Sequence, residues 1–301
     1  MTSPAPPACP MRSLLFIPGD SEKKLAKADS CGADVVIIDL EDAVAPARKE
    51  AARRLAAEFL SGRRDRRAGP RLWVRVNALD TGLTQHDVAA ILPARPDGIM
   101  QPKAEGARDV QRLSRLLDEA EEPGAEPLPI LPLVTETARA PFKLGEFADT
   151  PLQRLAGLTW GAEDLAAALG ATGARDEHGE WLFTFKLVRS LTLMAAHAAG
   201  VPAIETLHAD FRDEDGLRRS SRQARAEGFS GRLAIHPAQV PVINEAFSPS
   251  EEEMAEAQSI LDAFAAQPDA GTVGFEGRML DQPHRRAAER TIALAEALRR
   301  T

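Results

Sequence analysis

Eight short apolar runs recur along this chain and alternate with stretches of helical patterning. The runs are too short for typical helices, and the first three are rich in β-branched or aromatic residues, which favours strands. Strands that alternate with helices indicate an α/β fold, and eight of them are what a closed (β/α)8 barrel, the TIM barrel, requires. The runs are Ser13–Pro18, Asp34–Leu40, Arg71–Val76, Asp97–Gln101, Leu128–Val134, Leu155–Trp160, Pro202–Thr206 and Gly231–His236.

A doubly wound sheet is the alternative architecture, and it often has a glycine-rich first turn. The first turn here reads IPGDSEKK, and the chain contains neither G-x-G-x-x-G nor G-x-x-x-x-G-K-[ST], the motifs that cradle nucleotide phosphates. With 301 residues, 44% of them hydrophobic, the chain is long enough for the core of a single barrel. The barrel is therefore the predicted fold.

Helical stretches lie between the apolar runs. In the stretch at about 185–199, one apolar stripe predicts the face that packs on the core. That stripe consists of Leu187, Leu191, Met194 and Ala198. The other stretches are about 21–30, 46–60, 106–121, 213–227 and 239–246.

About 65 residues follow the eighth run. Ser250 to Glu253 form a capping box that opens a helix, and a glycine-containing link at Ala270–Gly277 leads to a last helix at about Pro283–Arg299. We therefore expect three parts: a disordered N-terminal tail over 1–11, a TIM-barrel catalytic domain over 12–248, and a C-terminal helical extension and lid over 249–301.

Composition argues against several classes of protein. No stretch approaches the roughly 18 apolar residues of a membrane helix, and the N-terminal MTSPAPPACP lacks the apolar core of a signal peptide. The two cysteines, Cys9 and Cys31, have no metal spacing and suit a reducing compartment, so we expect a cytoplasmic protein. The net charge of −8 gives no electrostatic support for nucleic-acid binding.

Polar residues cluster at one end of the predicted strands. In a barrel enzyme the catalytic groups come from the C-terminal ends of the strands. This one-ended bias therefore predicts a single polar site with several acids and one or two bases. The residues are Asp39, Glu41, Asp42, Arg75, Asn77, Gln101, Lys103, Glu136, Glu163, Asp164, Glu205 and His236.

Glu136 and Asp164 are the candidate metal ligands. They follow the fifth and sixth strands, and neighbouring strands lie about 4.8 Å apart, so the two carboxylates could share one cation. A site with few carboxylates, no Cys and no His cluster suits Mg²⁺, which keeps waters and accepts substrate oxygens. The alternative is that each acid caps the helix that follows it, and Asp164 before LAAALG is a suitable N-cap.

Three basic residues at the same end allow more than one interpretation. Arg75 lies inside an apolar run, where an unpaired arginine is costly to bury. It either pairs with an acid such as Asp39 or Glu41, or binds an anion at the mouth of the barrel. Lys103 could act as a Schiff-base nucleophile, although no second feature singles it out. His236, at a strand end, is either structural or catalytic.

Seven segments, taken together and in order, carry a resemblance to a known family. They are RSLLFIPGDSEKKLAKA, DVVIIDLEDAV, WVRVN, QPKAE, LPLVTETARA, LTWGAEDLAAALG and RLAIHPAQVPVINEAFSPS. They resemble the citrate lyase beta-subunit-like (CitE-like) branch of the HpcH/HpaI aldolase superfamily. The resemblance runs from about Arg12 to the closing helix. It implies a TIM barrel, a Mg²⁺ ion and carbon–carbon lyase chemistry on a hydroxyacyl thioester.

The resemblance also implies roles for particular residues. The metal carboxylates fall on Glu136 in VTETARA and Asp164 in GAEDL, and the substrate-binding arginine falls on Arg75 in VRVN. Where some relatives have a tyrosine that contacts coenzyme A, this chain has phenylalanine, so a hydroxyl contact is lost. The basic coenzyme A contacts would hold the nucleotide phosphates by charge; the alternative is that they are solvated helix-face charges. The implied coenzyme A contacts are Phe16, Lys23, Lys27 and Arg48.

The implied reaction cleaves or forms a 3-hydroxyacyl-CoA thioester such as malyl-, methylmalyl- or citramalyl-CoA, giving a 2-oxo acid and an acyl-CoA. Related proteins are commonly trimers, sometimes hexamers. The segment GFEGRMLDQPHRR resembles the family's lid motif, in which an aspartate, here Asp281, reaches a neighbouring subunit's active site as acid or base. Alternatively, Asp281 caps the last helix. Other possible functions are a citryl-acyl-carrier-protein lyase subunit of a citrate lyase complex, a malyl-CoA thioesterase and a non-catalytic acyl-CoA-binding barrel.

Overall fold

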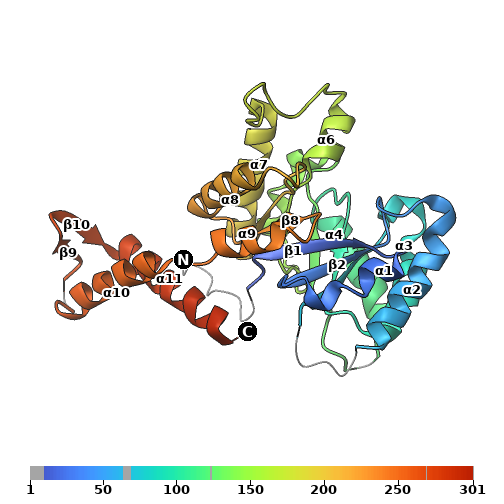
Figure 1. The fold of residues 1–301 in the computed structure, drawn as a ribbon, viewed down its shortest axis with the longest axis horizontal. Coiled ribbons are helices and arrows are strands. Elements are labelled where there is room, and N and C mark those ends of the chain that lie inside the picture. Colours follow the sequence, from blue (N-terminus) through green and yellow to red (C-terminus); the bar gives the residue numbers. More distant parts are fainter. Residues whose placement is uncertain (1–9, 64–68, 123, 269, 301) are drawn as a thin grey trace.

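A barrel of eight parallel strands forms the body of the protein (Figure 1). The computed structural model describes residues 10–63, 69–122, 124–268 and 270–300. Hydrogen-bonded neighbours follow the order β5-β4-β3-β2-β1-β8-β7-β6, and two isolated parallel bridges complete the ring: Ile130–Leu155 and Leu133–Thr159. Each strand lies inside the run that predicted it, so the predicted TIM barrel is confirmed. The strands are β1 Ser13–Pro18, β2 Val35–Asp39, β3 Arg71–Arg75, β4 Gly98–Gln101, β5 Ile130–Pro132, β6 Leu158–Thr159, β7 Ala203–Glu205 and β8 Gly231–Ala234.

Helices surround the barrel, and none among the described residues has the length and apolarity to cross a bilayer. The helix predicted at 21–30 is a short α1 followed by a 3-10 turn at Ala28–Ser30. Of the predicted tail, residues 1–9 lie outside the described residues, and Met11 is buried. The helices are α1 Glu22–Leu25, α2 Lys49–Ser61, α3 Thr84–Ile91, α4 Ala107–Ala120, α5 Glu146–Asp149, α6 Ala162–Leu169, α7 Phe183–Ala198, α8 Glu214–Glu227, α9 Gln239–Ala246, α10 Glu251–Ala265 and α11 Gln282–Arg300.

Two apolar layers result from the alternation of side chains along the strands. One face of each strand packs against the surrounding helices, and the other fills the barrel interior. The interior is therefore a packed core and not a pore, which leaves the strand ends as the place for a polar site. Its buried members are Met11, Leu14, Val35, Ile37, Trp73, Met100, Leu131, Leu133, Ile204 and Leu233.

Gly98 of β4 makes room for the buried indole of Trp73 inside the barrel. A Cβ at this position would lie 2.4 Å from Trp73 Cε2. We expect Gly98→Ala to lower the free energy of unfolding by about 1–3 kcal/mol, because the core cannot absorb the added carbon without strain. Urea unfolding measures this change. Gly145→Ala is the control, because no atom lies within 4 Å of its Cβ position and its φ of −62° suits alanine.

The prediction for the buried face of α7 is wrong. Leu187 and Met194 of the predicted stripe are 45% and 57% exposed. The buried stripe instead includes Phe185, Val188 and Arg189, whose guanidinium donates to Glu205 of β7 at 2.6 Å. Helical periodicity allowed both stripes. The stripe that is buried contains a charged residue, Arg189, whereas the predicted stripe was wholly apolar.

The C-terminal extension stands apart from the barrel in Figure 1. Its predicted capping box is confirmed: Ser250 Oγ accepts from the Glu253 amide at 3.1 Å, and a Glu253 carboxylate oxygen accepts from the Ser250 amide at 2.8 Å. The predicted glycine-containing link is in part a β-hairpin, β9 Thr272–Phe275 paired with β10 Arg278–Asp281. This hairpin packs on α10 through a small core of its own, Phe264, Val273 and Leu280.

Candidate active site

The C-terminal ends of β1 to β6 and the segments that follow them form the mouth of the barrel. The ends of β2 and β3 make one wall of this mouth. Arg75 closes β3, and its guanidinium makes two hydrogen bonds to the Asp39 carboxylate, at 2.8 and 2.6 Å. Its remaining terminal nitrogen lies 3.0 Å from a Glu41 carboxylate oxygen. The sequence allowed Arg75 either to pair with acids or to bind an anion, and in this structure it pairs with acids.

Arg75 is largely buried, with 12% of its side chain exposed. Burial alone would lower its pKa, but the hydrogen bonds and charge of Asp39 and the charge of Glu41 outweigh burial and raise it. The arginine is therefore a fixed cation. Phe16 of β1 lies against it, with the guanidinium carbon 4.8 Å from the ring centroid. This places Phe16 at the wall of the mouth.

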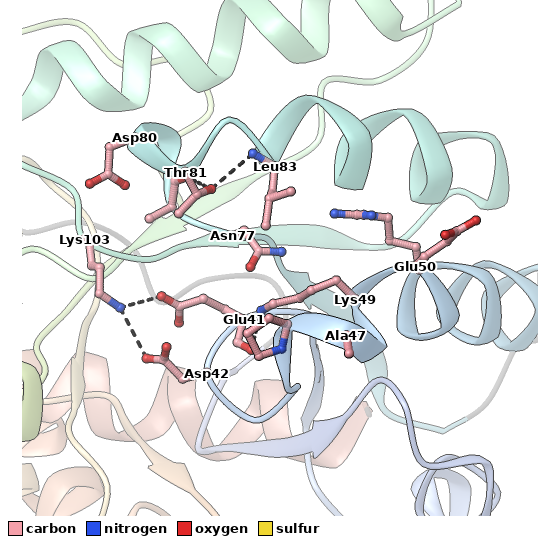
Figure 2. Close-up of a pocket in the computed structure, with 13 residues that line it drawn as sticks. Glu41, Asp42, Ala47, Lys49, Glu50, Asn77, Asp80, Thr81, Leu83 and Lys103 are labelled. Atoms are coloured by element: carbon pink, nitrogen blue, oxygen red, sulfur yellow. Dashed lines mark hydrogen bonds and ion pairs between the residues drawn. The ribbon is translucent and has the colours of Figure 1, made fainter.

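Lys103 follows β4 and lies among acids from three segments. Its ammonium donates to Glu41 at 2.5 Å and to Asp42 at 3.2 Å (Figure 2). It also lies 3.5 Å from Asp164. Burial would lower the pKa of Lys103, but the hydrogen bond and charge of Glu41, together with the charges of Glu136 and Asp164, raise it. A Schiff-base nucleophile needs a neutral amine, so this environment argues against that alternative.

Glu136, after β5, is 5% exposed and accepts a hydrogen bond from the Lys103 amide at 2.6 Å. The pKa of Glu136 is raised to about 8, chiefly by burial and also by the charge of Asp164. The backbone hydrogen bond and the charge of Lys103 lower the pKa but do not offset burial. The Glu136 carboxylate packs closely against the backbone at Gly161, where a Cβ would lie 3.0 Å from Glu136 Oε1. A glycine at this position allows that close approach.

Asp164 lies in the first turn of α6, whose N-cap is Gly161. The N-cap alternative for Asp164 is therefore wrong. Lys103 contacts both candidate metal ligands: its amide donates to Glu136 at 2.6 Å, and its ammonium lies 3.5 Å from the Asp164 carboxylate. No group of three His, Cys, Asp or Glu residues suited to a metal occurs in the described part of the chain.

These residues fit Mg²⁺. Two carboxylates supply hard oxygen ligands, and the Lys103 amide holds Oε2 of the buried one, Glu136. A pair of protein carboxylates completed by water and substrate oxygens is a common Mg²⁺ environment. Glu136 and Asp164 would hold the ion.

The residues implied in coenzyme A binding are spread along one side of the barrel. Phe16 lies at the mouth, whereas Lys23 of α1 and Lys27 after it are exposed to solvent. Arg48 is tied to the first turn through Asp20: its Nε lies 3.4 Å from the carboxylate, and its Nη2 donates to the carbonyl oxygen at 3.2 Å. The solvated-charge alternative therefore stays open for Lys23 and Lys27.

Asp281 ends β10 in the extension and is not brought to the mouth of its own barrel (Figure 1). Its carboxylate is 46% exposed and lies 2.6 Å from Nδ1 of His284. The structure thus leaves the side chain accessible from outside this chain.

Two residues support the segment after β2 from behind the mouth, and the sequence pattern pointed to only one of them, Asn77. Lys49 of α2 donates to the carbonyl oxygens of Leu40 and Glu41, both at 2.7 Å. These two hydrogen bonds fix the position of the segment after β2. Asn77 donates to the same Leu40 carbonyl at 3.0 Å. A cavity of about 730 Å³ opens beside these residues (Figure 2). Its lining includes Asp80 and Lys103. No motif marks Lys49, because its partners are backbone atoms.

A TIM barrel with paired carboxylates and fixed cations at its mouth is the architecture of an enzyme active site. Residues 12–237 match the family model described as HpcH/HpaI aldolase/citrate lyase. The chain belongs to this family, as the sequence motifs predicted, and it is therefore an enzyme of the aldolase and lyase type.

Several curated relatives are similar over most of their length. The citrate lyase subunit beta-like protein of Mycobacterium tuberculosis is 38% identical over 270 residues, covering 89% of this chain and 90% of the relative. A (3S)-malyl-CoA thioesterase of Cereibacter sphaeroides is 37% identical over 299 residues, covering 97% and 96%. The mitochondrial citramalyl-CoA lyase of Rattus norvegicus is 33% identical over 311 residues, covering 96% and 87%.

A solved structure shows the same fold. The protein CitE from M. tuberculosis, in complex with magnesium, acetoacetate and coenzyme A, superposes with a TM-score of 0.81 at 36% identity. The match covers 96% of this chain and 99% of that one. The magnesium of that complex agrees with the metal expected from the donor set here.

Proposed function

We propose that the protein is a Mg²⁺-dependent carbon–carbon lyase that cleaves or forms a 3-hydroxyacyl-CoA thioester, with a 2-oxo acid and an acyl-CoA as the other reactants. The observation that carries the proposal is the pair Glu136 and Asp164 at the mouth, beside the cations Arg75 and Lys103. Magnesium and coenzyme A in the M. tuberculosis CitE complex support it.

In this proposal each group of residues has a separate role in the reaction. Glu136 and Asp164 would hold Mg²⁺, and the bound ion would supply Lewis acidity that favours ionisation of the substrate hydroxyl. Arg75, fixed by Asp39 and Glu41, lies in the mouth as a permanent positive charge and stabilises the oxygen that becomes negative as the carbon–carbon bond breaks. A proton must then reach the enolate carbon, and Asp281 supplies it.

Asp281 acts on a neighbouring subunit in this proposal. The extension that carries it stands apart from its own barrel, and the carboxylate is exposed. A homotrimer, or a hexamer, would bring such an extension to the mouth of a neighbouring subunit. Phe16, Lys23, Lys27 and Arg48 contact the coenzyme A, with the basic residues on its phosphates. We place the enzyme in the cytoplasm, on the composition of the chain.

A thioesterase acting on malyl-CoA is the second candidate, because relatives of that name are as similar to this chain as the lyase-like ones. It would use the same metal site and add water to the thioester. A lyase acting on a citryl-acyl-carrier protein would differ in needing a protein-bound substrate.

A panel of thioesters tests the proposal. Purified protein with Mg²⁺ is given malyl-, methylmalyl- and citramalyl-CoA and a citryl-acyl-carrier protein, and products are separated by liquid chromatography. We expect acyl-CoA and 2-oxo acid from at least one CoA thioester. Free CoA as the sole thiol product from every member would favour the thioesterase instead.

A further inference from the structure

Lys103 has an unusual backbone. Its φ is +53°, in the left-handed region that side-chain-bearing residues rarely adopt. Such strain persists only where the surroundings impose it, and it concentrates at functional sites. Here the conformation directs the backbone N–H to Glu136 Oε2 at 2.6 Å, which fixes one carboxylate oxygen and leaves the other on the side of Gly161.

The Lys103 ammonium is the more accessible of the two cations at this wall. Arg75 is 12% exposed and its guanidinium is engaged by Asp39 and Glu41. Lys103 is 27% exposed and lines the cavity of about 730 Å³. Its ammonium is held by Glu41 at 2.5 Å and more loosely by Asp42 and Asp164, at 3.2 and 3.5 Å. The two longer contacts can be exchanged for a ligand.

We propose that Lys103 is a positioning residue that orients Glu136 through its backbone and, through its ammonium, balances cation binding against anion binding at the mouth. The inference rests on the proposed function, in which Glu136 and Asp164 hold Mg²⁺. A positive charge beside these carboxylates opposes a second cation, and the same charge attracts the carboxylate of a 2-oxo acid. In a half-buried site, charges a few ångströms apart change an affinity by about tenfold or more.

The test is a pair of binding measurements on Lys103→Met. This substitution keeps an unbranched side chain of similar length and the backbone amide donor, but it removes the positive charge. By calorimetry we expect Mg²⁺ to bind about tenfold more tightly than to the wild-type protein. Pyruvate, added to Mg²⁺-saturated protein, should bind about tenfold more weakly. The KM for the 2-oxo acid should rise in parallel. A purely structural role would weaken both ligands, so opposite changes identify charge balance.

Two further variants test whether the charge, and not the left-handed strain, sets the two affinities. Lys103→Arg restores the charge and should return both affinities toward wild type. Lys103→Gly relieves the left-handed strain and keeps the amide donor, so it should behave like Lys103→Met. Arg95→Gly is the matched control, because Arg95 also has a positive φ, +52°, but is 63% exposed and paired with Glu122. It should change neither affinity.

Weaker or unchanged Mg²⁺ binding in Lys103→Met, with normal folding by circular dichroism, overturns the charge-balancing inference. Failure of the wild-type protein to bind Mg²⁺ is a different result. It removes the metal site of the proposed function, and the inference falls with it.

Discussion

Glu136→Ala should abolish carbon–carbon cleavage, and chelation of divalent cations should do the same to the wild-type protein. The substitution removes the buried one of the two carboxylates that the proposal gives to Mg²⁺. Without the ion the substrate hydroxyl keeps a pKa far above neutral, and the alkoxide that drives cleavage does not form. Turnover of the best substrate in the panel measures the effect, and calorimetry measures the loss of Mg²⁺ binding.

The control for this variant is Glu119→Ala, which removes an exposed glutamate of α4 and should leave turnover and Mg²⁺ binding unchanged. Adding Mg²⁺ back to chelated wild-type protein should restore activity, whereas adding it to Glu136→Ala should not. Full activity of wild-type protein in excess chelator contradicts the metal assignment.

Asp281→Asn should lower turnover by at least about a hundredfold, the usual scale for loss of an acid or base. Folding and Mg²⁺ binding should persist, because the side chain is exposed and lies in the extension, which stands apart from the barrel. Steady-state kinetics and Mg²⁺ calorimetry on the same preparation measure both quantities. Asp262→Asn, an exposed aspartate of α10, is the matched control and should be fully active.

Mixed oligomers test whether Asp281 acts between subunits. Asp281→Asn subunits retain a metal site, and Glu136→Ala subunits retain the lid aspartate, so mixing two inactive proteins should restore part of the activity. Mass spectrometry of intact assemblies verifies that mixed oligomers form. If they form and stay inactive, Asp281 does not act on a neighbouring mouth.

The barrel was predictable because each strand is a short, self-contained apolar run, and a strand needs no partner to be recognised in the sequence. The face of α7 was not predictable in the same way. Leu187 and Arg189 both lie on stripes with helical spacing, and the sequence gives no sign that Glu205 of β7 supplies a buried partner for Arg189. The β9–β10 hairpin was missed for a similar reason, since its strands pack on α10 through only two buried residues of their own.

The sequence predicted which residues lie at the site, but it did not predict the hydrogen bonds and ion pairs between them. The spacing placed Glu136 and Asp164 after neighbouring strands, and in the structure both carboxylates lie at Lys103. The spacing did not show that the Lys103 amide donates to Glu136. This hydrogen bond depends on the left-handed φ of Lys103, and a lysine in the sequence does not indicate such a conformation. Nor did the spacing decide whether Arg75 pairs with acids or stays free.

The fate of one labelled carbon tests the central claim most directly. A hydroxyacyl-CoA substrate that carries ¹³C at its hydroxyl-bearing carbon is incubated with the protein and Mg²⁺, and the products are followed by carbon NMR. A carbon–carbon lyase converts the labelled carbon into the carbonyl of a 2-oxo acid and leaves an unlabelled acyl-CoA. Label retained in an intact hydroxy acid, with free CoA released, would contradict the account and identify a thioesterase.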